Sequence, residues 1–455
     1  MTITAAEYSL YLFFFSWCWL SVAVSAFTDV FVFAKERRDI LTATEEFRLN
    51  PSTRAAVYSS FYLGWLFGDP FFGWIADKWG RHPSVYIATA LGLIFQASCA
   101  LAVGPYSLFS LRLFAGVCMG GADLVAYVHC IELSGVQQRA TSGSVMQCFF
   151  ACGLCLAASF AVVFPDWRQL YFVAALPTAL FIISWWWIPE SPKWLANQLR
   201  SGKLKGGEKL QHSKAETADQ HRALLHVTEE AGQVVGDGGS EDEKGHRNQT
   251  ENGDKEFTYS MLLKDSDTSQ LLMTVCVVWL IGGFVYYGIT LSAGSISKEI
   301  HLNMFLMGLV EIPAYVLSRY LADTAGRKSS YISLTLLAAF FCLVSWSYPR
   351  KGGRLLFALV GKIFASGAFS LVWMWSPEIF PTGARSLTTA IGSQAARVGS
   401  ILAPYVVVLM SEMESTVDGS GVSHPPLPQP IFAAVGCISA LVACFLPETV
   451  GVEMI

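Results

Sequence analysis

Several ionisable residues lie inside long apolar stretches of the sequence, among them Arg397, Lys362, Asp123, Glu311 and Asp69, which precedes a proline. A charge at the centre of a bilayer costs roughly 2.5–3.5 kcal/mol on insertion scales, so such residues persist mainly for function. Arg397, in "SQAARVGSILAPY", offers a planar guanidinium that suits a carboxylate. We therefore expect Arg397 to bind an anionic group; pairing with an acidic residue of a neighbouring helix is the alternative.

The other intramembrane charges leave two interpretations each. Lys362 either faces an internal cavity or extends its amine to the membrane surface, and the second interpretation also competes for Arg112. Asp123, in "GGADLVAYVHC", could pair with an arginine or carry a proton. Glu311 is either a substrate-binding residue or a partner for Arg319, two turns away. We count Lys362, Asp123 and Glu311 as candidate binding residues.

Aromatic residues gather in the stretch "WLIGGFVYYGITL", which contains Trp279, Tyr286 and Tyr287. Their ring faces could hold an apolar or quaternary-ammonium group through cation–π attraction. Aromatic residues in membrane helices are also common as packing and interface residues, which is the alternative here. We include all three among the candidate binding residues.

No pattern of an enzyme active site is visible in the sequence. It has no Ser/His/Asp arrangement, no metal-ligand spacing and no glycine-rich cofactor or ATP loop. Cys148, Cys152 and Cys155 share one helical face but have no histidine or carboxylate neighbours, so we interpret them as small residues at a helix contact. The sequence thus predicts neither enzyme nor cofactor nor metal site.

Two charged clusters interrupt the apolar stretches, "GWIADKWGRH" near residue 77 and "YLADTAGRK" near residue 323. An acidic group at a helix end can accept hydrogen bonds from the N-terminus of a neighbouring helix. Setting the membrane topology is the plainer role of the basic residues. Five pairs of like residues recur 246 positions apart, which indicates a duplicated unit: Asp77 with Asp323, Gly80 with Gly326, Arg81 with Arg327, Glu132 with Glu378, and Arg139 with Arg385.

The elements that carry these residues are membrane spans. The chain of 455 residues is 53% hydrophobic and 15% charged, which predicts an integral, all-α, polytopic membrane protein. The net charge is only −4 and the basic residues are scattered, so a nucleic-acid partner is excluded. Apolar runs long enough to cross a bilayer predict twelve helices, near residues 8–33, 56–76, 84–103, 106–130, 142–164, 169–188, 269–291, 303–321, 330–347, 355–376, 388–410 and 430–446.

A polar, glycine-rich stretch separates the two halves. We therefore divide the chain into a six-helix bundle at 1–192, a disordered linker at 193–267 and a second bundle at 268–455. Basic residues of the linker and of both charged clusters fall on one side, which the positive-inside rule makes cytoplasmic. Both termini would then be cytoplasmic as well, although Lys35, Arg37 and Arg38 would lie outside.

Several stretches together carry a family resemblance. "GWIADKWGRH" resembles the signature of the major facilitator superfamily between its second and third helices. "PESPKWL", "SPEIFPTGAR" and "LVEIPAYVLSRYLADTAGRK" are similar to the organic cation/carnitine and organic anion transporter branch. The outer segment after the first span departs from that branch, because residues 34–55 contain no cysteine.

The resemblance implies a major facilitator fold of two six-helix bundles and a role for the charged clusters. In the family, Asp77 and Arg81 would form a latch with the eleventh helix that holds the outward-open state, and Glu132 and Arg139 would extend it. The equivalent residues of the second half would form the second latch: Asp323, Arg327, Glu378 and Arg385.

The expected function is secondary transport of a small organic ion by alternating access. The family position matching Arg397 is an arginine in anion and carnitine carriers and an aspartate in classical cation carriers, so an anion or a carnitine-like zwitterion is favoured. The alternatives are an organic cation carrier of the same branch and a non-transporting sensor or receptor. Expected partners are the substrate, the lipid bilayer and a coupling proton or sodium ion; the plasma membrane is the expected location and an internal membrane the alternative.

Overall fold

The computed structural model describes residues 4–33, 42–135, 138–200, 266–292, 299–348, 351–381, 384–417 and 428–450. In these ranges every regular element is a helix, and ten helical segments are long and apolar enough to cross a membrane. Two more helices, α4 (Pro51–Trp79) and α21 (Gln429–Ala443), complete the twelve. The all-α, polytopic architecture expected from the sequence is therefore confirmed.

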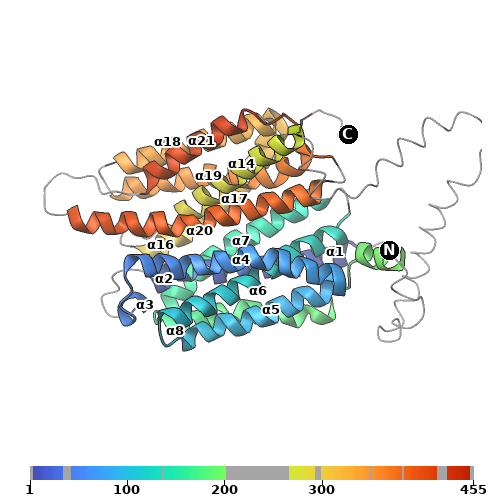
Figure 1. Cartoon of the computed structure of the whole chain (residues 1–455), viewed down its shortest axis with the longest axis horizontal. Coiled ribbons are helices and arrows are strands. Elements are labelled where there is room, and N and C mark those ends of the chain that lie inside the picture. Colours follow the sequence, from blue (N-terminus) through green and yellow to red (C-terminus); the bar gives the residue numbers. More distant parts are fainter. Residues whose placement is uncertain are drawn as a thin grey trace, which may run out of the picture.

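The helices of the first half form one layer in Figure 1, drawn in blue to green, and those of the second half form another, drawn in yellow to red. The first bundle contains α1 (Ala5–Phe27), α2 (Asp29–Val32), α3 (Ala43–Glu46), α4 (Pro51–Trp79), α5 (Arg81–Ser98), α6 (Pro105–Leu133), α7 (Arg139–Val163), α8 (Trp167–Ala174) and α9 (Leu176–Ile182). The second contains α14 (Ser266–Leu291), α16 (Ile300–Leu309), α17 (Glu311–Ala325), α18 (Arg327–Ser347), α19 (Lys351–Ile379), α20 (Arg385–Val417) and α21 (Gln429–Ala443).

Two of the predicted spans are broken by proline. The span expected at 303–321 consists of α16 and α17, which meet at Val310. Pro313 has no N–H to donate to the carbonyl of residue 309, so the helical ladder is interrupted there. The span expected at 169–188 divides in the same way between α8 and α9, because Pro177 has no N–H to donate to the carbonyl of Val173.

Most of the predicted linker, residues 201–265, lies outside the described residues. Its first residues differ from the prediction, because Pro192–Arg200 forms helix α10. Two hydrogen bonds of Trp194 hold α10 against the first bundle. Its backbone N–H donates to Oγ of Ser191 at 3.2 Å, and its indole N–H donates to the carbonyl of Asp77 at 2.9 Å. We call the end of the molecule where α10 lies the linker end, and the opposite end the far end.

Close packing inside each bundle depends on small residues. Gly116 of α6 lies against the carbonyl of Phe61 in α4, and Gly399 of α20 lies against the carbonyl of Leu280 in α14. A Cβ at either glycine would collide with that backbone oxygen. Such close approach is a common way to hold membrane helices together, because the bilayer supplies no hydrophobic force between them.

The two bundles touch from the middle of the membrane to the far end. Ser59 of α4 donates to the carbonyl of Ile401 in α20 at 2.7 Å, and Gly308 of α16 packs on Ala151 of α7. At the linker end, in contrast, the side chains of Asp77 and Asp323 are 72% and 58% exposed. The interface between the bundles is thus closed on the side away from the linker.

Candidate functional site

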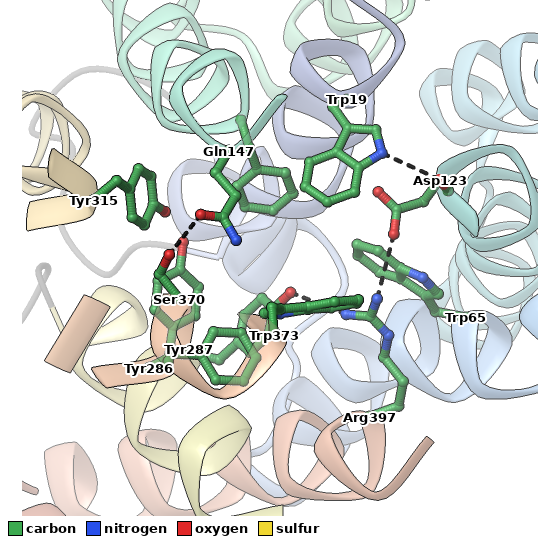
Figure 2. A pocket seen from close by; sticks show the side chains of 12 residues that line it. Trp19, Trp65, Asp123, Gln147, Tyr286, Tyr287, Tyr315, Ser370, Trp373 and Arg397 are labelled. Carbon is green, nitrogen blue, oxygen red and sulfur yellow. Dashed lines mark hydrogen bonds and ion pairs between the residues drawn. The ribbon is translucent and has the colours of Figure 1, made fainter. Parts of the chain in front are cut away.

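A cavity lies between the bundles, and Figure 2 shows the side chains around it. Residues of both halves of the chain contribute to its wall. Most of the wall is aromatic, with one arginine and one aspartate among the polar groups. The lining residues are Trp19, Trp65, Asp123, Gln147 and Phe150 from the first bundle, and Tyr286, Tyr287, Tyr315, Phe369, Ser370, Trp373 and Arg397 from the second.

Arg397 projects from α20 into the space between the bundles, where its side chain is 5% exposed. Its Nη2 lies 3.4 Å from Oδ2 of Asp123, and its Nη1 donates to the hydroxyl of Tyr287 at 3.2 Å. The guanidinium also stacks on the ring of Trp65, with Cζ 3.8 Å from the ring centre. Arg397 therefore has both of the surroundings that the sequence suggested, a cavity and an acidic neighbour (Figure 2).

A second carboxylate supports the guanidinium from behind. Oδ2 of Asp69, on α4, lies 3.7 Å from Nε of Arg397 and accepts a hydrogen bond from Nε2 of Gln394 at 3.0 Å. Asp69 is not among the residues that line the cavity. Arg397, Asp69 and Asp123 together carry one positive and two negative formal charges, so this cluster is acidic by one charge.

The three aromatic residues of α14 have different positions. Tyr286 and Tyr287 line the cavity, and their rings meet edge to face with centres 5.0 Å apart. Trp279 lies in the core of the second bundle, where its indole N–H donates to Ser376 at 3.1 Å and its ring packs on Trp373. Trp279 thus supports the cavity wall from behind and does not form part of its surface.

Glu311 and Lys362 form a buried ion pair inside the second bundle, with 2.7 Å between Nζ and Oε1 and no exposure of either side chain. The hydroxyls of Tyr286 and Tyr315, which line the cavity, both donate to Oε2 of Glu311. Lys362 therefore does not extend to the membrane surface, and the partner of Glu311 is Lys362 instead of Arg319. The sequence missed this pair because 51 positions separate its members.

Arg112 is likewise fully buried, so the surface position considered for it is wrong. Its guanidinium lies 2.7 Å from Asp29 of α2, and also donates to Gln96 at 2.8 Å and to the carbonyl of Ser25 at 3.1 Å. The hydroxyl of Tyr171 donates to the other oxygen of Asp29 at 2.7 Å. Asp29 was not identified from the sequence, although a lone aspartate in the first apolar run was the available signal.

The first charged cluster closes on itself at the linker end. Arg81 lies 2.6 Å from Asp77 and 3.3 Å from Glu132, and Ser191 donates to Glu132 at 2.6 Å. Glu190 accepts the backbone N–H of Arg81 at 2.8 Å, at the N-terminus of α5. These contacts all lie within the first bundle, so the structure does not bring Asp77 to α20.

The second cluster has the same geometry. Arg327 lies 3.0 Å from Glu378 and 3.4 Å from Asp323, and Thr449 donates to Glu378 at 2.6 Å. Glu448 accepts the backbone N–H of Arg327 at 2.8 Å. Gly80 and Gly326, which precede the two capped helices, have φ angles of +108° and +91°, a region that favours glycine.

Glu190, Ser191, Glu448 and Thr449 complete the clusters but were not counted among the predicted latch residues. The repeated "PES" and "PET" triplets were the signal that could have found them. Burial raises the pKa of Glu190 above its usual value. Burial acts in the same direction on Glu448, but the backbone N–H groups around that more exposed carboxylate outweigh it and lower its pKa.

Of the outer pair of predicted latch residues, Arg139 and Arg385, the first takes less part. Arg139 is exposed and forms no ion pair with Glu132, whose described partners are Arg81 and Ser191. Arg385 donates from Nε to the carbonyl of Phe380 at 3.1 Å. Among the described residues no group of three or more metal-ligating side chains occurs. Cys155 lies against Gly308 at a helix contact, which is the role the sequence suggested for it.

Comparison with known proteins agrees with this geometry. The family model described as "Sugar (and other) transporter" matches residues 21–455. The chain is 31% identical to "Organic cation/carnitine transporter 4" of Arabidopsis thaliana, over 87% of this chain and 71% of that protein. It is 30% identical to "Organic cation transporter protein" of Drosophila melanogaster, over 87% of this chain and 69% of that protein.

Among solved structures, the inward-open conformation of the xylose transporter XylE from E. coli superimposes with a TM-score of 0.66, covering 99% of this chain and 98% of that one. The sequence identity is 18%, so this similarity concerns the fold alone. It establishes the major facilitator fold that the sequence predicted. The chain therefore belongs to the major facilitator superfamily, in its organic cation/carnitine transporter branch of secondary transporters.

Proposed function

We propose that this transporter carries small organic ions that bear an anionic group, either anions or carnitine-like zwitterions, by alternating access. The observation that carries the proposal is Arg397, which lies at the wall of an aromatic cavity between the bundles. A guanidinium presents paired N–H donors to a carboxylate, and the rings of Trp65 and Tyr287 supply flat apolar surfaces for the remainder of a substrate.

Alternating access requires that the two bundles rock about the site. The cavity suits this movement because one wall comes from each bundle, and the ion pair of Arg397 and Asp123 joins them. The charged clusters at the linker end would act as latches that favour one open state over the other. Since the chain has no ATP loop, energy would come from an ion or substrate gradient, with a proton or sodium ion as coupling ion.

An organic cation carrier is the second candidate. The acidic excess of the cluster around Arg397 favours it, as do the printed names of the relatives. A sensor that no longer transports is disfavoured, because both charged clusters keep their ion pairs. The plasma membrane, with both termini in the cytoplasm, is the location we propose from the distribution of basic residues.

Uptake of labelled carnitine, simple carboxylates and quaternary amines into cells that carry the protein at their surface tests the proposal. We expect carboxylate-bearing compounds to be taken up, and Arg397→Ala to lower their kcat/KM by roughly 30-fold or more. Arg397→Lys should keep part of the activity, because a charge remains but the planar fork is lost. Arg319→Ala, a partly exposed arginine of α17, is the control. Uptake restricted to quaternary amines, or none at all, would contradict the proposal.

A further inference from the structure

Arg397 is already occupied in this structure. Asp123 engages its Nη2, and Asp69 lies behind its Nε. A substrate carboxylate that binds Arg397 must therefore compete with a carboxylate of the protein itself. Of the two, only Asp123 lines the cavity, whereas Asp69 is held by Gln394 at 3.0 Å. Asp123 is thus the group that a substrate can displace.

A displaced Asp123 would be a buried carboxylate without its cation. One of its oxygens, Oδ2, faces Nη2 of Arg397. Its side chain is 7% exposed, so water replaces the lost ion pair poorly. A single anionic substrate would leave this charge uncompensated, and the affinity gained at Arg397 would be lost again at Asp123.

The surroundings of Asp123 suit a cation. Trp19 donates its indole N–H to the backbone carbonyl of Asp123 at 3.1 Å, which places its ring beside the carboxylate, and Trp65 lies on the other side (Figure 2). Both rings line the cavity. A carboxylate between two indole rings combines charge attraction with cation–π attraction, the combination that binds quaternary ammonium groups.

Building on the proposed function, we propose that Asp123 is the specificity-determining residue that selects zwitterionic substrates. The substrate's carboxylate would replace Asp123 on Arg397, and its cationic group would replace Arg397 on Asp123. One ion pair between protein groups is exchanged for two between protein and substrate, and no charge is left alone. Because the exchanged pair joins α20 to α6, the same step removes an ion pair between the bundles.

Three isosteric probes test this. The first is a trimethylammonium carboxylate; the second replaces its nitrogen by carbon, so that only the carboxylate is charged; the third replaces its carboxylate by a primary amide, so that only the ammonium is charged. In the wild type we expect kcat/KM for the zwitterion to exceed that for the isosteric anion by roughly 30-fold, the usual cost of leaving a buried charge unpaired.

The variants separate selection from simple support of Arg397. Asp123→Asn should bring the ratio of zwitterion to anion close to one, by improving the anion and weakening the zwitterion. Asp69→Asn should keep the wild-type ratio, because Asp69 lies behind Arg397, and the exposed Asp267→Asn should change nothing. If Asp123 only positioned Arg397, Asp123→Asn would lower transport of all three probes by the same factor.

The outcomes distinguish failure of the proposed function from failure of the role proposed for Asp123. Failure of the wild type to move any probe contradicts the proposed function itself. Transport of the probes with an unchanged zwitterion-to-anion ratio in Asp123→Asn overturns the selective role of Asp123 alone. If Asp123→Asn does not reach the cell surface, the wild type alone still tests the proposal. Equal kcat/KM values for the zwitterion and the isosteric anion in the wild type would also overturn the selective role of Asp123.

Discussion

The buried ion pair of Asp29 and Arg112 should dominate the stability of the first bundle's far end. It joins α2 to α6, and both side chains are almost completely buried, with 0% exposure for Arg112 and 1% for Asp29. We consider two single variants, Asp29→Leu and Arg112→Met, and the double variant that carries both. Each single variant leaves one buried charge without its partner.

The expected magnitudes follow from what each variant leaves behind. Removing one partner of a buried ion pair costs about 3–5 kcal/mol, because the remaining charge is uncompensated. The double variant leaves no charge. The hydroxyl of Tyr171 and the carbonyl of Ser25 each lose a polar partner, and Gln96 loses one of its two donors. That should cost about 1–3 kcal/mol in total. Gln96 still accepts a hydrogen bond from Ser25.

The measurement is the free energy of unfolding in mixed micelles, titrated with a denaturing detergent and followed by tryptophan fluorescence. A half-exposed ion pair, Glu46 with Arg168 at 2.5 Å, provides the control. Glu46→Gln should change the free energy of unfolding by about 1 kcal/mol or less, since exposed ion pairs contribute little.

The double-mutant cycle is the decisive comparison. We expect the double variant to be more stable than either single variant, with an interaction free energy of at least about 3 kcal/mol. Additive losses in the double variant would refute the reasoning, because they would mean that neither charge depends on the other. Single variants as mild as Glu46→Gln would refute the burial of the pair.

Two further predictions concern the linker end and the helix packing. The pKa of Glu448 is lowered from 4.5, so its contribution to stability should be present above pH 4.5 and should be lost as the pH falls below that value. A Glu448→Gln variant whose unfolding shows the same pH profile as the wild type would count against this prediction. Gly116→Val should cost about 3 kcal/mol of unfolding free energy, because the added Cβ meets the carbonyl of Phe61. Gly352→Val is the control and should be neutral, since open space surrounds Gly352. Equal effects of the two substitutions would disprove the close packing of α4 on α6.

Much of the fold was predictable because its determinants are local. Apolar runs of bilayer length marked the spans, and the repeat between Asp77 and Asp323 marked the duplicated halves. The breaks at Val310 and Ala175 were not predicted, although Pro313 and Pro177 were visible. A proline fixes only the loss of a hydrogen bond, and neighbouring helices decide whether the chain bends or breaks there.

Candidate site residues were found as single charges, not as pairs. The sequence identified Arg397, Asp123, Lys362 and Glu311 because a charge inside an apolar run is conspicuous. It placed Trp279 with Tyr286 and Tyr287, although one helix presents them to different surroundings. Trp279 is buried in the bundle core, while both tyrosines line the cavity.

By itself, the sequence determined which residues must be buried in the membrane, how many helices carry them and which positions of the two halves correspond. Only the tertiary structure decided the partners: Arg397 with Asp123, Lys362 with Glu311, and Arg112 with Asp29. The physical reason is that hydropathy and repeat spacing are properties of the linear chain. Ion pairing inside a bilayer depends instead on which helix faces meet, and those faces can belong to residues 274 positions apart.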